Sequence, residues 1–518
     1  MSPGRNPQPF GTSIAIRGRP AEVTELVVEL LDRLRGLGWE VEGDKRGRSP
    51  LRATRLTSGE QWLAVTVASP TPHRLSHAAE YELSVSGVVR DRADLHDLVA
   101  ALPFTQLELD VLAHDMPLTA SVAERAPSWM PGLKLQGRPL AGLGAIFTIH
   151  HQTDFVLLLE KALELGVERE MVTVIDKEYR YRHSRRVDAH IRRRLEVPVY
   201  RYSEIKKGLS DHIRRVDEAR VASGASSWTK TIIVDDGGYV LPLLQESFEP
   251  FLNFFLGAVE QTRSGIWKLQ PYAEDHRVPI FSVAESDLKA TVEAHGVAQA
   301  ALTCLRGLMP HEKFDGRRAV VVGYGTIGAA LADLLRRQRI DVYVADSEDS
   351  RLVAAREFGF QVSENLADLI RQVKPRYLFS CAKPGAVGRT ELEAIEKDCV
   401  LASLTSRDAA FDKEALAAIA KARKLGTVGT LYTDGASASN ILLLANGFPL
   451  NFHFSESMPN QQSDLVMASL LAGAITLART TPSWPPGNEP DRANSALNEG
   501  SLLHDFLRLE PRLDSEPK

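Results

Sequence analysis

Cysteine is scarce in this sequence: Cys304, Cys381 and Cys399 are the three thiols in a chain of 518 residues. So few cysteines exclude a disulfide framework, and their spacing fits no zinc site. Structural disulfides belong mainly to oxidising compartments. The scarcity of cysteine therefore predicts a cytoplasmic protein without a structural metal centre.

Long apolar segments are also missing. No uncharged apolar run approaches the roughly 18 residues that a membrane-spanning helix needs. The first residues, Met1–Gly11, are polar and rich in proline and glycine, and they lack the apolar centre of a signal peptide. We therefore expect neither a secretion signal nor a membrane partner.

Neither sign of charge dominates the composition. The chain has 62 Lys and Arg against 67 Asp and Glu, which gives a formal net charge of -5. This balance argues against a general attraction to nucleic acids or membrane surfaces. The 44% hydrophobic and 25% charged residues are ordinary for a folded protein, and the length exceeds what one core supports, so several domains are expected.

Hydrophobic patterning divides the chain into five parts. We expect a small α+β accessory unit over 1–104, an α/β unit over 105–285, a second α/β unit over 286–450, a helix returning to the first α/β unit over 451–479, and a mobile tail over 480–518. Strands that alternate with helices favour parallel sheets with right-handed crossovers. The predicted fold class is therefore α/β, with two Rossmann-like parallel-sheet domains after the N-terminal unit.

The clearest motif is a glycine-rich turn between a predicted strand, Ala319–Val322, and a predicted helix, Ala329–Arg336. Its residues are Gly323, Tyr324, Gly325, Thr326, Ile327 and Gly328. In this context the first glycine permits a tight turn, the second lets a pyrophosphate approach the backbone, and the third allows close helix–strand packing. The free N–H groups of the helix then face the phosphates. The motif predicts a dinucleotide site.

Asp346 follows the next predicted strand, Asp341–Ala345, close to the spacing of roughly 20 residues expected after the glycines. A carboxylate there accepts both ribose hydroxyls and repels a 2′-phosphate, so NAD is favoured over NADP. Arg351 lies nearby and could compensate the charge. The alternative is a Rossmann-like turn with no ligand.

Several other segments, in the same order along the chain, resemble one family, the S-adenosylhomocysteine hydrolases. The segments are Met130–Leu133, Arg138–Gly142, His150–Thr153, Val197–Tyr200, Asp235–Gly238 and Glu260–Gly265. With the glycine motif, the resemblance covers roughly residues 115–478. It implies a substrate domain over 105–285 and an NAD-binding domain over 286–450. It also implies a reaction that begins with NAD-dependent oxidation of a ribose hydroxyl.

The resemblance assigns roles to individual positions. It implies an active-site histidine at His150, a ribose-proximal aspartate at Asp236, NAD contacts at Thr262, Ser264 and Asn440, and the ribose-binding acid at Asp346. A base and an acid near the ribose need tuned pKa values. His150 could instead cap a strand end, and Asp236 could belong to a plain turn, since Asp-Gly pairs favour turns.

Other positions depart from the family. Gln152 and Gln261 replace a threonine and a glutamate, Leu288 and Val292 stand at the catalytic lysine and aspartate, Val297 replaces a cysteine, and Ser406 and Phe448 replace two histidines. A register slip by one residue would place Lys289 at the lysine position. Lys289, Glu293 and His295 thus remain acid–base candidates, unless they are solvated helix residues. Ordinary S-adenosylhomocysteine hydrolysis is not expected.

The segment 177–194 is rich in cations. They are Lys177, Arg180, Arg182, Arg185, Arg186, Arg192, Arg193 and Arg194. Such a run is commonly a solvated helix face. Because arginine binds phosphate and carboxylate in a bidentate manner, an anionic substrate is the alternative. Nucleic acid is disfavoured, since Tyr179 and Tyr181 are the only interleaved aromatic residues.

Two functional hypotheses remain. The first is an NAD-dependent enzyme acting on a nucleoside-like or other small hydroxyl substrate, with His150 and Asp236 transferring protons. The second is a non-catalytic NAD-binding relative that binds a partner through its N-terminal unit. A homo-oligomer is implied by the resemblance. However, the family's C-terminal lysine and tyrosine, which reach a neighbouring subunit's cofactor, have no counterpart in residues 492–518.

Overall fold

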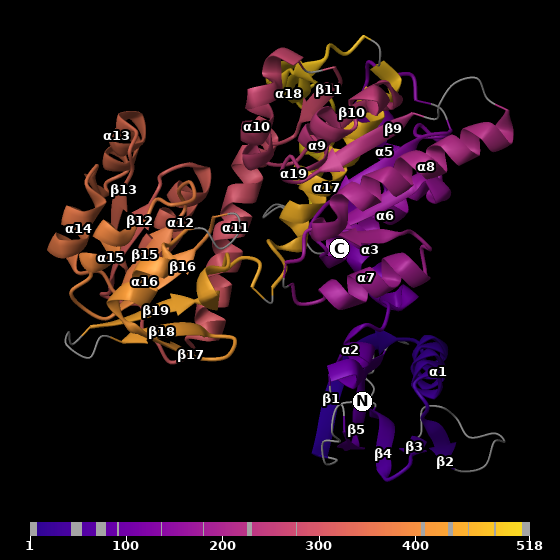
Figure 1. Cartoon of the computed structure of the whole chain (residues 1–518). Coiled ribbons are helices and arrows are strands. Elements are labelled where there is room, and N and C mark those ends of the chain that lie inside the picture. Colours follow the sequence, from indigo (N-terminus) through magenta and orange to yellow (C-terminus); the bar gives the residue numbers. More distant parts are fainter. Residues whose placement is uncertain are drawn as a thin grey trace, which may run out of the picture.

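The computed structural model describes residues 8–42, 54–68, 79–90, 93–135, 137–179, 181–224, 230–275, 277–405, 410–433, 439–453, 455–480 and 483–509. These residues form three sheets, of five, seven and eight strands. Each sheet belongs to its own domain, and the N-terminal domain adjoins the second domain but lies away from the third (Figure 1). The predicted fold class is confirmed, because two of the sheets are mainly parallel and Rossmann-like.

The N-terminal domain is an antiparallel sheet covered by two helices. Its strands are β1 (Gln8–Gly18), β2 (Glu40–Glu42), β3 (Thr54–Ser58), β4 (Gln61–Ala68) and β5 (Ala79–Val89), in the order β1-β5-β4-β3-β2. The helices are α1 (Pro20–Gly36) and α2 (Ala93–Ala100). Alternation along the strands buries Leu63, Val65 and Leu83 against the apolar stripe of α1. This packing follows the two periodicities of strand and helix.

The second domain, called here the substrate domain, has a parallel sheet in the order β20-β11-β10-β9-β6-β7-β8. The strands are β6 (Gly144–Thr148), β7 (Val172–Asp176), β8 (Val199–Arg201), β9 (Thr231–Asp235), β10 (Phe255–Glu260), β11 (Pro279–Ser282) and β20 (Gly487–Asn488). The chain first winds from β6 toward β8 and then from β9 toward β11. This reversal leaves a crevice at the carboxyl ends of β6 and β9, where ligands of such sheets bind.

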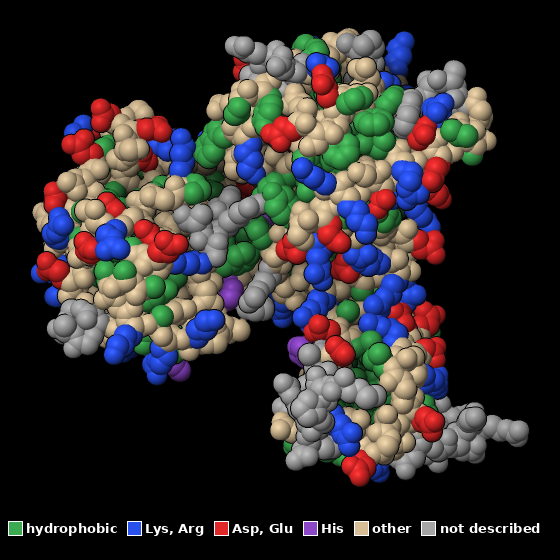
Figure 2. All heavy atoms as spheres, in the orientation of Figure 1, with side chains coloured by type: hydrophobic (Ala, Val, Ile, Leu, Met, Phe, Trp, Pro, Cys, Tyr) green, Lys and Arg blue, Asp and Glu red, His purple; other side chains and the backbone are tan. Residues whose placement is uncertain are grey.

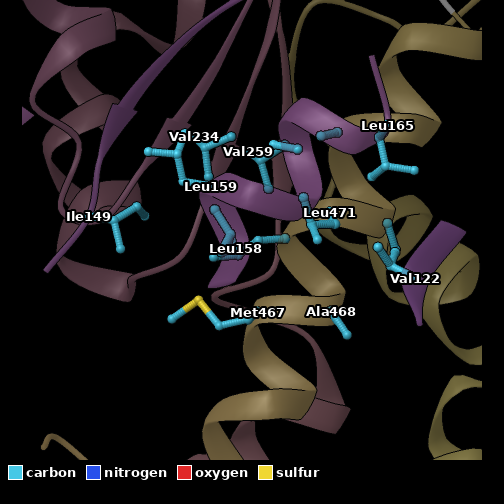
Figure 3. Close-up of a cluster of buried hydrophobic side chains, with 14 of the residues drawn as sticks. Val122, Ile149, Leu158, Leu159, Leu165, Val234, Val259, Met467, Ala468 and Leu471 are labelled. Atoms are coloured by element: carbon cyan, nitrogen blue, oxygen red, sulfur yellow. The ribbon is translucent and has the colours of Figure 1, made fainter. Parts of the chain in front are cut away.

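Helices cover both faces of this sheet (Figure 1). They are α3 (Gln106–Asp115), α4 (Pro117–Ala120), α5 (Val122–Trp129), α6 (Thr153–Glu164), α7 (Ser184–Arg193), α8 (Ile205–Ser223), α9 (Val240–Ser247) and α10 (Arg263–Leu269). The core helix α17 (Asn460–Thr480) packs with Met467, Ala468 and Leu471 close to Leu158 and Leu159 of α6 (Figure 3). Among the described residues, α17 alone is long and apolar enough to cross a membrane, and 83% of its most apolar window is buried in this core.

The third domain, called here the NAD domain, has the strand order β14-β13-β12-β15-β16-β19-β18-β17. The strands are β12 (Arg318–Val322), β13 (Asp341–Ala345), β14 (Gln361–Ser363), β15 (Tyr377–Ser380), β16 (Cys399–Ser403), β17 (Lys421–Lys424), β18 (Gly429–Thr433) and β19 (Asn440–Leu444). The helices are α12 (Thr326–Arg337), α13 (Asp349–Glu357), α14 (Leu366–Val373), α15 (Arg389–Glu393) and α16 (Lys413–Ile419). The long helix α11 (Asp287–Leu308) enters this domain and packs on α12 and α17. The winding direction reverses between β12 and β15, which places a second crevice there.

The prediction of a mobile tail over 480–518 is wrong for residues 483–509. β20 pairs with β11, and the helices α18 (Pro490–Asn498) and α19 (Leu502–Leu509) follow. Their apolar residues join the core of the substrate domain: Trp484, Ala493, Leu497, Leu502 and Phe506. The polar composition concealed these residues; within each short helix the two buried residues are four positions apart, which gives the helix one apolar face. Residues 510–518 lie outside the described residues.

Helix α7 joins the substrate domain to the N-terminal domain, and Lys and Arg side chains gather at this junction (Figure 2). Arg185 pairs with Asp97, and Arg193 and Arg194 both pair with Glu29. Arg192 pairs with Asp188 of its own helix, and Arg180 lies outside the described residues. Most of the predicted basic segment therefore serves contacts within the chain.

Arg186 is the buried centre of this junction. Its guanidinium donates two hydrogen bonds to Glu108, at 3.0 and 2.6 Å, and others to the carbonyl oxygens of Leu102 and Pro103. The same group lies 4.3 Å from the ring centroid of Phe104. Replacing Arg186 with alanine is expected to lower the free energy of unfolding by about 3–5 kcal/mol, because the Glu108 carboxylate would stay buried without its cationic partner.

Urea unfolding of the purified chain measures this loss. The matched control is Arg185→Ala, whose pair with Asp97 is solvent-exposed and should contribute less than about 1 kcal/mol. Equal losses in the two variants would contradict a special role of Arg186.

His212 predicts how stability depends on pH. Its ring bridges the Thr173 and Thr231 hydroxyls at 3.0 Å each, and burial lowers its pKa to about 3. An unfolded histidine titrates near 6.5, so the unfolded chain gains a proton below that pH while the folded chain does not. The contribution of His212 to the free energy of unfolding is therefore complete above about pH 6.5. As the pH falls below this value, the free energy of unfolding decreases by about 1.4 kcal/mol per pH unit.

Urea unfolding at pH 7 and pH 5 tests this expectation. In His212→Asn, the drop in unfolding free energy between these pH values should be smaller than in the wild type by about 2 kcal/mol. Asn keeps a hydrogen-bonding side chain but does not titrate. An unchanged pH dependence in His212→Asn would refute the assignment.

Candidate active site

His150 and Asp236, the two proton-transfer candidates, lie together at the crevice of the substrate domain. β6 and β9 are neighbours in which Thr148 is in register with Asp235, so the residues that follow the two strands meet. The Asp236 amide donates to the Thr148 carbonyl at 2.9 Å. The distance from His150 Nε2 to Asp236 Oδ2 is 3.1 Å. Strand order thus joins two residues that are far apart in the sequence.

Lys177 is a third member of this cluster that the sequence did not single out. Its Nζ lies 2.7 Å from Asp236 Oδ1, 2.7 Å from the Asp236 carbonyl oxygen and 3.0 Å from His150 Nε2. The lysine and aspartate side chains are only 5% and 3% exposed. Lys177 immediately follows β7, the neighbour of β6, and this position at a strand's carboxyl end was the available signal.

Burial and neighbouring charges set the protonation of the cluster. Burial lowers the pKa of His150 to about 3, the charge of Asp236 opposes this shift, and the charge of Lys177 adds to it. Burial alone would raise the pKa of Asp236, but its attraction to His150, Lys177 and Lys289 and its hydrogen bond with Lys177 outweigh burial, and that pKa is lowered. The site therefore holds a neutral imidazole beside an ionised carboxylate.

Aromatic rings from two domains surround His150. The Phe452 centroid lies 4.4 Å from that of His150, and those of Tyr179 and Tyr181 lie at 5.2 and 5.4 Å. The Tyr181 hydroxyl also contacts His150 Nδ1. Phe448 packs edge-on against Tyr179 at 5.3 Å. Because Phe448 and Phe452 follow β19, the segment leaving the NAD domain forms one wall of the site.

Lys289 and Glu293 lie on α11, beside this cluster. The Lys289 Nζ donates to the Gln261 carbonyl oxygen and lies 3.0 Å from Glu293 Oε2. Burial raises the pKa of Glu293, and the charge of Lys289 opposes the shift. These two residues thus neutralise each other near Asp236, without contacting it within hydrogen-bond distance. His295 is exposed on the same helix.

Thr262 follows β10 as the N-cap of α10, and Ser264 lies in the first turn of that helix. The Thr262 oxygen caps α10 by accepting from the Gly265 amide at 3.0 Å, and it accepts from Ser264 Oγ at 3.1 Å. The Glu260 carboxylate accepts hydrogen bonds from the backbone amides of Gly237 and Gly238, and burial raises the pKa of Glu260 to about 8. These bonds fix the Asp235–Gly238 turn to the loop expected to face NAD.

The glycine turn has the geometry that a dinucleotide requires. Gly323 has a φ of +89°, and a Cβ there would lie 2.9 Å from the Ala382 nitrogen. A Cβ on Gly328 would overlap the Gly323 carbonyl oxygen, whereas one on Gly325 would meet only the Arg351 Nη1, at 3.9 Å. The helix α12 begins at Thr326, so its free amides face the open side at Gly325. The turn therefore fits a pyrophosphate.

The remaining residues of this turn anchor it. Tyr324 is buried against Phe360, with ring centroids 5.9 Å apart. Ile327 packs against the apolar cluster of Val297, Met458 and Val466 beneath α11 and α17. Thr326 is exposed at the helix start. The turn is thus held on both sides by apolar contacts, which keeps its backbone rigid for a ligand.

Asp346 lies directly beside the glycine turn. Its Oδ2 accepts from the Tyr324 amide at 2.6 Å, and its Oδ1 accepts from the Glu348 amide at 3.0 Å. Each carboxylate oxygen has a second lone pair, so both retain capacity for ribose hydroxyls. The Arg351 Nη1 lies 3.8 Å from Asp346 Oδ2. Position and chemistry fit the ribose-binding acid of an NAD site.

The prediction for Asn440 is wrong. Asn440 begins β19, which runs parallel to β16, and its backbone and side chain donate to Asp398 Oδ1 at 2.7 and 3.1 Å. The glycine turn follows the carboxyl end of β12 in the same sheet. Asn440 therefore lies at the opposite edge and cannot reach a cofactor there. Ser406, another position of interest, lies outside the described residues.

The described residues contain no cluster of three or more His, Cys, Asp or Glu side chains that could hold a metal ion. The cations and carboxylates of the site instead pair with one another. His150, Asp236 and Lys177 form one group, and Lys289 with Glu293 forms the next. The arrangement is suited to moving protons beside a bound organic cofactor.

Comparison with known proteins supports the cofactor. Residues 288–436 match the NAD-binding domain of the D-isomer-specific 2-hydroxyacid dehydrogenases. The adenosylhomocysteinase of Haloquadratum walsbyi is 28% identical over 135 residues, which cover 26% of this chain and 31% of that protein. The S-inosyl-L-homocysteine hydrolase of Methanopyrus kandleri is 23% identical over 379 residues, 72% of this chain and 83% of that protein. The predicted cofactor, NAD, is confirmed at the level of the domain.

These likenesses are distant. The chain spans 31 to 47% of the length of the adenosylhomocysteinases that it matches. A glyoxylate/hydroxypyruvate reductase from Sinorhizobium meliloti, solved with NADP and malonate, is 15% identical, with a TM-score of 0.38 over 67% of this chain and 97% of that chain. A score this far below 0.5 does not establish a shared arrangement of domains.

Proposed function

We propose that this chain, a divergent relative of the adenosylhomocysteinases, is an NAD-dependent enzyme that oxidises a hydroxyl group of a nucleoside-like or other small substrate. One observation carries the proposal. His150, Asp236 and Lys177 form a buried cluster at the crevice of the substrate domain, walled on one side by the segment that leaves the NAD domain. Titratable groups with shifted pKa values in such a crevice mark active sites.

The chemistry divides between cofactor and chain. NAD, when bound, supplies the acceptor for a hydride. The chain must remove the hydroxyl proton. The neutral His150 imidazole keeps one unprotonated nitrogen, and this nitrogen can accept the proton once the bound substrate displaces the group that faces it, Lys177 Nζ at Nε2 or the Tyr181 hydroxyl at Nδ1. Asp236, ionised at 3.1 Å, stabilises the imidazolium that results. A general base held by a buried carboxylate contributes about 10²–10⁴-fold to such reactions.

The first turns of α11 support a substrate or reaction different from ordinary S-adenosylhomocysteine hydrolysis. Leu288 is buried in the core of the substrate domain, and Val292 packs against the same core. These are the positions at which the resemblance places a catalytic lysine and aspartate. Lys289 lies about 100° further around the helix, where it binds Gln261 and Glu293. The helix face that would supply the acid–base pair is therefore apolar.

The second candidate is a non-catalytic NAD-binding relative. The rings of Phe452, Tyr179 and Tyr181 pack closely around His150, which favours a site that has lost its substrate. The N-terminal domain, anchored through Arg186, would then bind a partner. The two candidates differ in whether bound NAD is ever reduced.

The deciding experiment is mass spectrometry of ligands released from the purified protein, followed by absorbance at 340 nm with a panel of nucleosides and small alcohols. We expect released NAD and NADH formation with at least one compound. Bound NAD that is never reduced would support the non-catalytic relative. Absence of NAD binding would refute both.

Other features of the proposal concern partners and location. An anionic substrate would rely on Lys177, whose charge is already matched by Asp236, or on the exposed Arg182, because Arg185, Arg186 and Arg192–Arg194 bind within the chain. We also infer a cytoplasmic location, from the scarcity of cysteine, and a homo-oligomer, from the resemblance. Light scattering of the purified protein tests the oligomer.

A further inference from the structure

The ammonium group of Lys177 is completely engaged inside the site. A lysine has three N–H donors and no acceptor. The three acceptors within reach are the Asp236 carbonyl oxygen, Asp236 Oδ1 and His150 Nε2, at 2.7, 2.7 and 3.0 Å. The surrounding strands β6, β7 and β9 fix all three, so Lys177 has one geometry available. Its side chain is therefore a rigid link between the carboxylate and the imidazole.

The orientation of His150 depends on this link. Nε2 faces both Lys177 Nζ and Asp236 Oδ2, at 3.0 and 3.1 Å, while Nδ1 faces the Tyr181 hydroxyl. Without Lys177, Nε2 would face only the carboxylate, and a carboxylate alone attracts a proton onto the ring. The lysine therefore opposes the formation of an imidazolium–carboxylate pair before substrate is present.

Other charges near His150 are more distant or already paired. The titratable groups that face the ring are Asp236, Lys177, His151, Lys289, Tyr179 and Tyr181. Lys289 is bound to Gln261 and Glu293, and the His151 pKa is itself lowered by burial. Among the described residues, Lys177 is the one cation with a hydrogen bond to the imidazole.

We infer that Lys177 is a positioning residue that sets the protonation state and orientation of His150. The cation hydrogen-bonded to His150 thus comes from the end of β7, whereas Lys289 of α11 binds Gln261 and Glu293. The inference concerns the proposed active site, and it rests on the proposed function only for its catalytic consequence. The protonation state and orientation of His150 are properties of the protein before any substrate binds.

The test is NMR of the full-length protein with isotope-labelled histidine, in which His150→Gln identifies the His150 signal. In the wild type, the His150 ring should remain unprotonated from pH 8 down to pH 5. In Lys177→Met, which keeps chain length but removes the charge, the titration should move upward by about one to three pH units. Lys177→Arg should remain close to the wild type. Lys161→Met, on α6 where the ammonium pairs with Glu164, should not change the titration.

Removing one partner of a buried ion pair can prevent folding. The second comparison is therefore Asp236→Asn against the double variant Lys177→Met/Asp236→Asn, which removes both charges. His150 should titrate at higher pH in the double variant, by about one unit or more. Identical titrations in this comparison, or in folded Lys177→Met and wild type, would overturn the inference.

The measurement needs no substrate, so it separates this inference from the proposed function. If no compound yields NADH but the titration moves as expected, the proposed function fails and the role of Lys177 stands. With a substrate in hand, the low-pH limb of kcat should shift with the NMR titration in Lys177→Met. If Lys177→Met changed only KM and did not shift the low-pH limb of kcat, the role of Lys177 would be structural only.

Discussion

Asp236→Asn is expected to reduce turnover by about 10²–10⁴-fold while NAD remains bound. The carboxylate lies 3.1 Å from His150 Nε2 and 2.7 Å from Lys177 Nζ, so the substitution removes the charge that stabilises a protonated imidazole. Asparagine nearly preserves the volume of the side chain. We expect NAD at the glycine turn of a different domain, so its binding should be unaffected. NADH formation at 340 nm measures turnover, and mass spectrometry of released ligands measures NAD.

The matched control is Asp217→Asn on α8, where an exposed aspartate pairs with Arg220. It should keep wild-type turnover and NAD. Wild-type turnover in Asp236→Asn would show that Asp236 takes no part in the reaction. Loss of NAD together with turnover would instead show that the variant disturbs the whole fold, which circular dichroism and urea unfolding would detect.

Gly328→Ala is expected to weaken NAD binding by at least about 100-fold, which corresponds to roughly 2.7 kcal/mol. A methyl group there overlaps the Gly323 carbonyl oxygen, so the turn must open before α12 can pack against β12. The first amides of α12 would then leave the position from which they bind phosphate. Titration calorimetry with NAD on protein freed of bound nucleotide measures the change.

Two other glycines separate the possible causes. Gly325→Ala should fold like the wild type, because its Cβ meets only Arg351 Nη1 at 3.9 Å, yet it should bind NAD more weakly by obstructing the pyrophosphate. Gly307→Ala, on α11 with no atom within 4 Å of the added Cβ, should bind NAD normally. If NAD binding were unchanged in both Gly328→Ala and Gly325→Ala, the cofactor would not bind at this turn.

The NAD domain was largely predictable because its signals are local. The apolar run Ala319–Val322, the glycines and Asp346 lie within one short segment, and the structure places the turn and the acid side by side. Asn440 failed for the opposite reason. It was assigned from the family resemblance, with irregular spacing, and strand direction places it at the other edge of the sheet. The glycine spacing carries information on the local turn, whereas the direction and order of later strands depend on the whole sheet.

The basic segment shows a similar limit. Its composition gave no means of separating Lys177, buried beside His150, from Arg186, buried against Glu108, or from the arginines that meet the N-terminal domain. Each has the same charge and a similar sequence environment. Their roles differ because β7 ends beside β6, while α7 faces residues 97–108.

By itself the sequence determined the alternation of strands and helices, the two Rossmann-like domains and the dinucleotide turn, because hydrophobic period and glycine position act over a few residues. Only the tertiary structure joined His150, Asp236 and Lys177, showed that Asn440 lies away from the glycine turn, and incorporated residues 483–509 into the core. These contacts link segments far apart along the chain. They depend on strand order and register, which arise from packing over the whole domain.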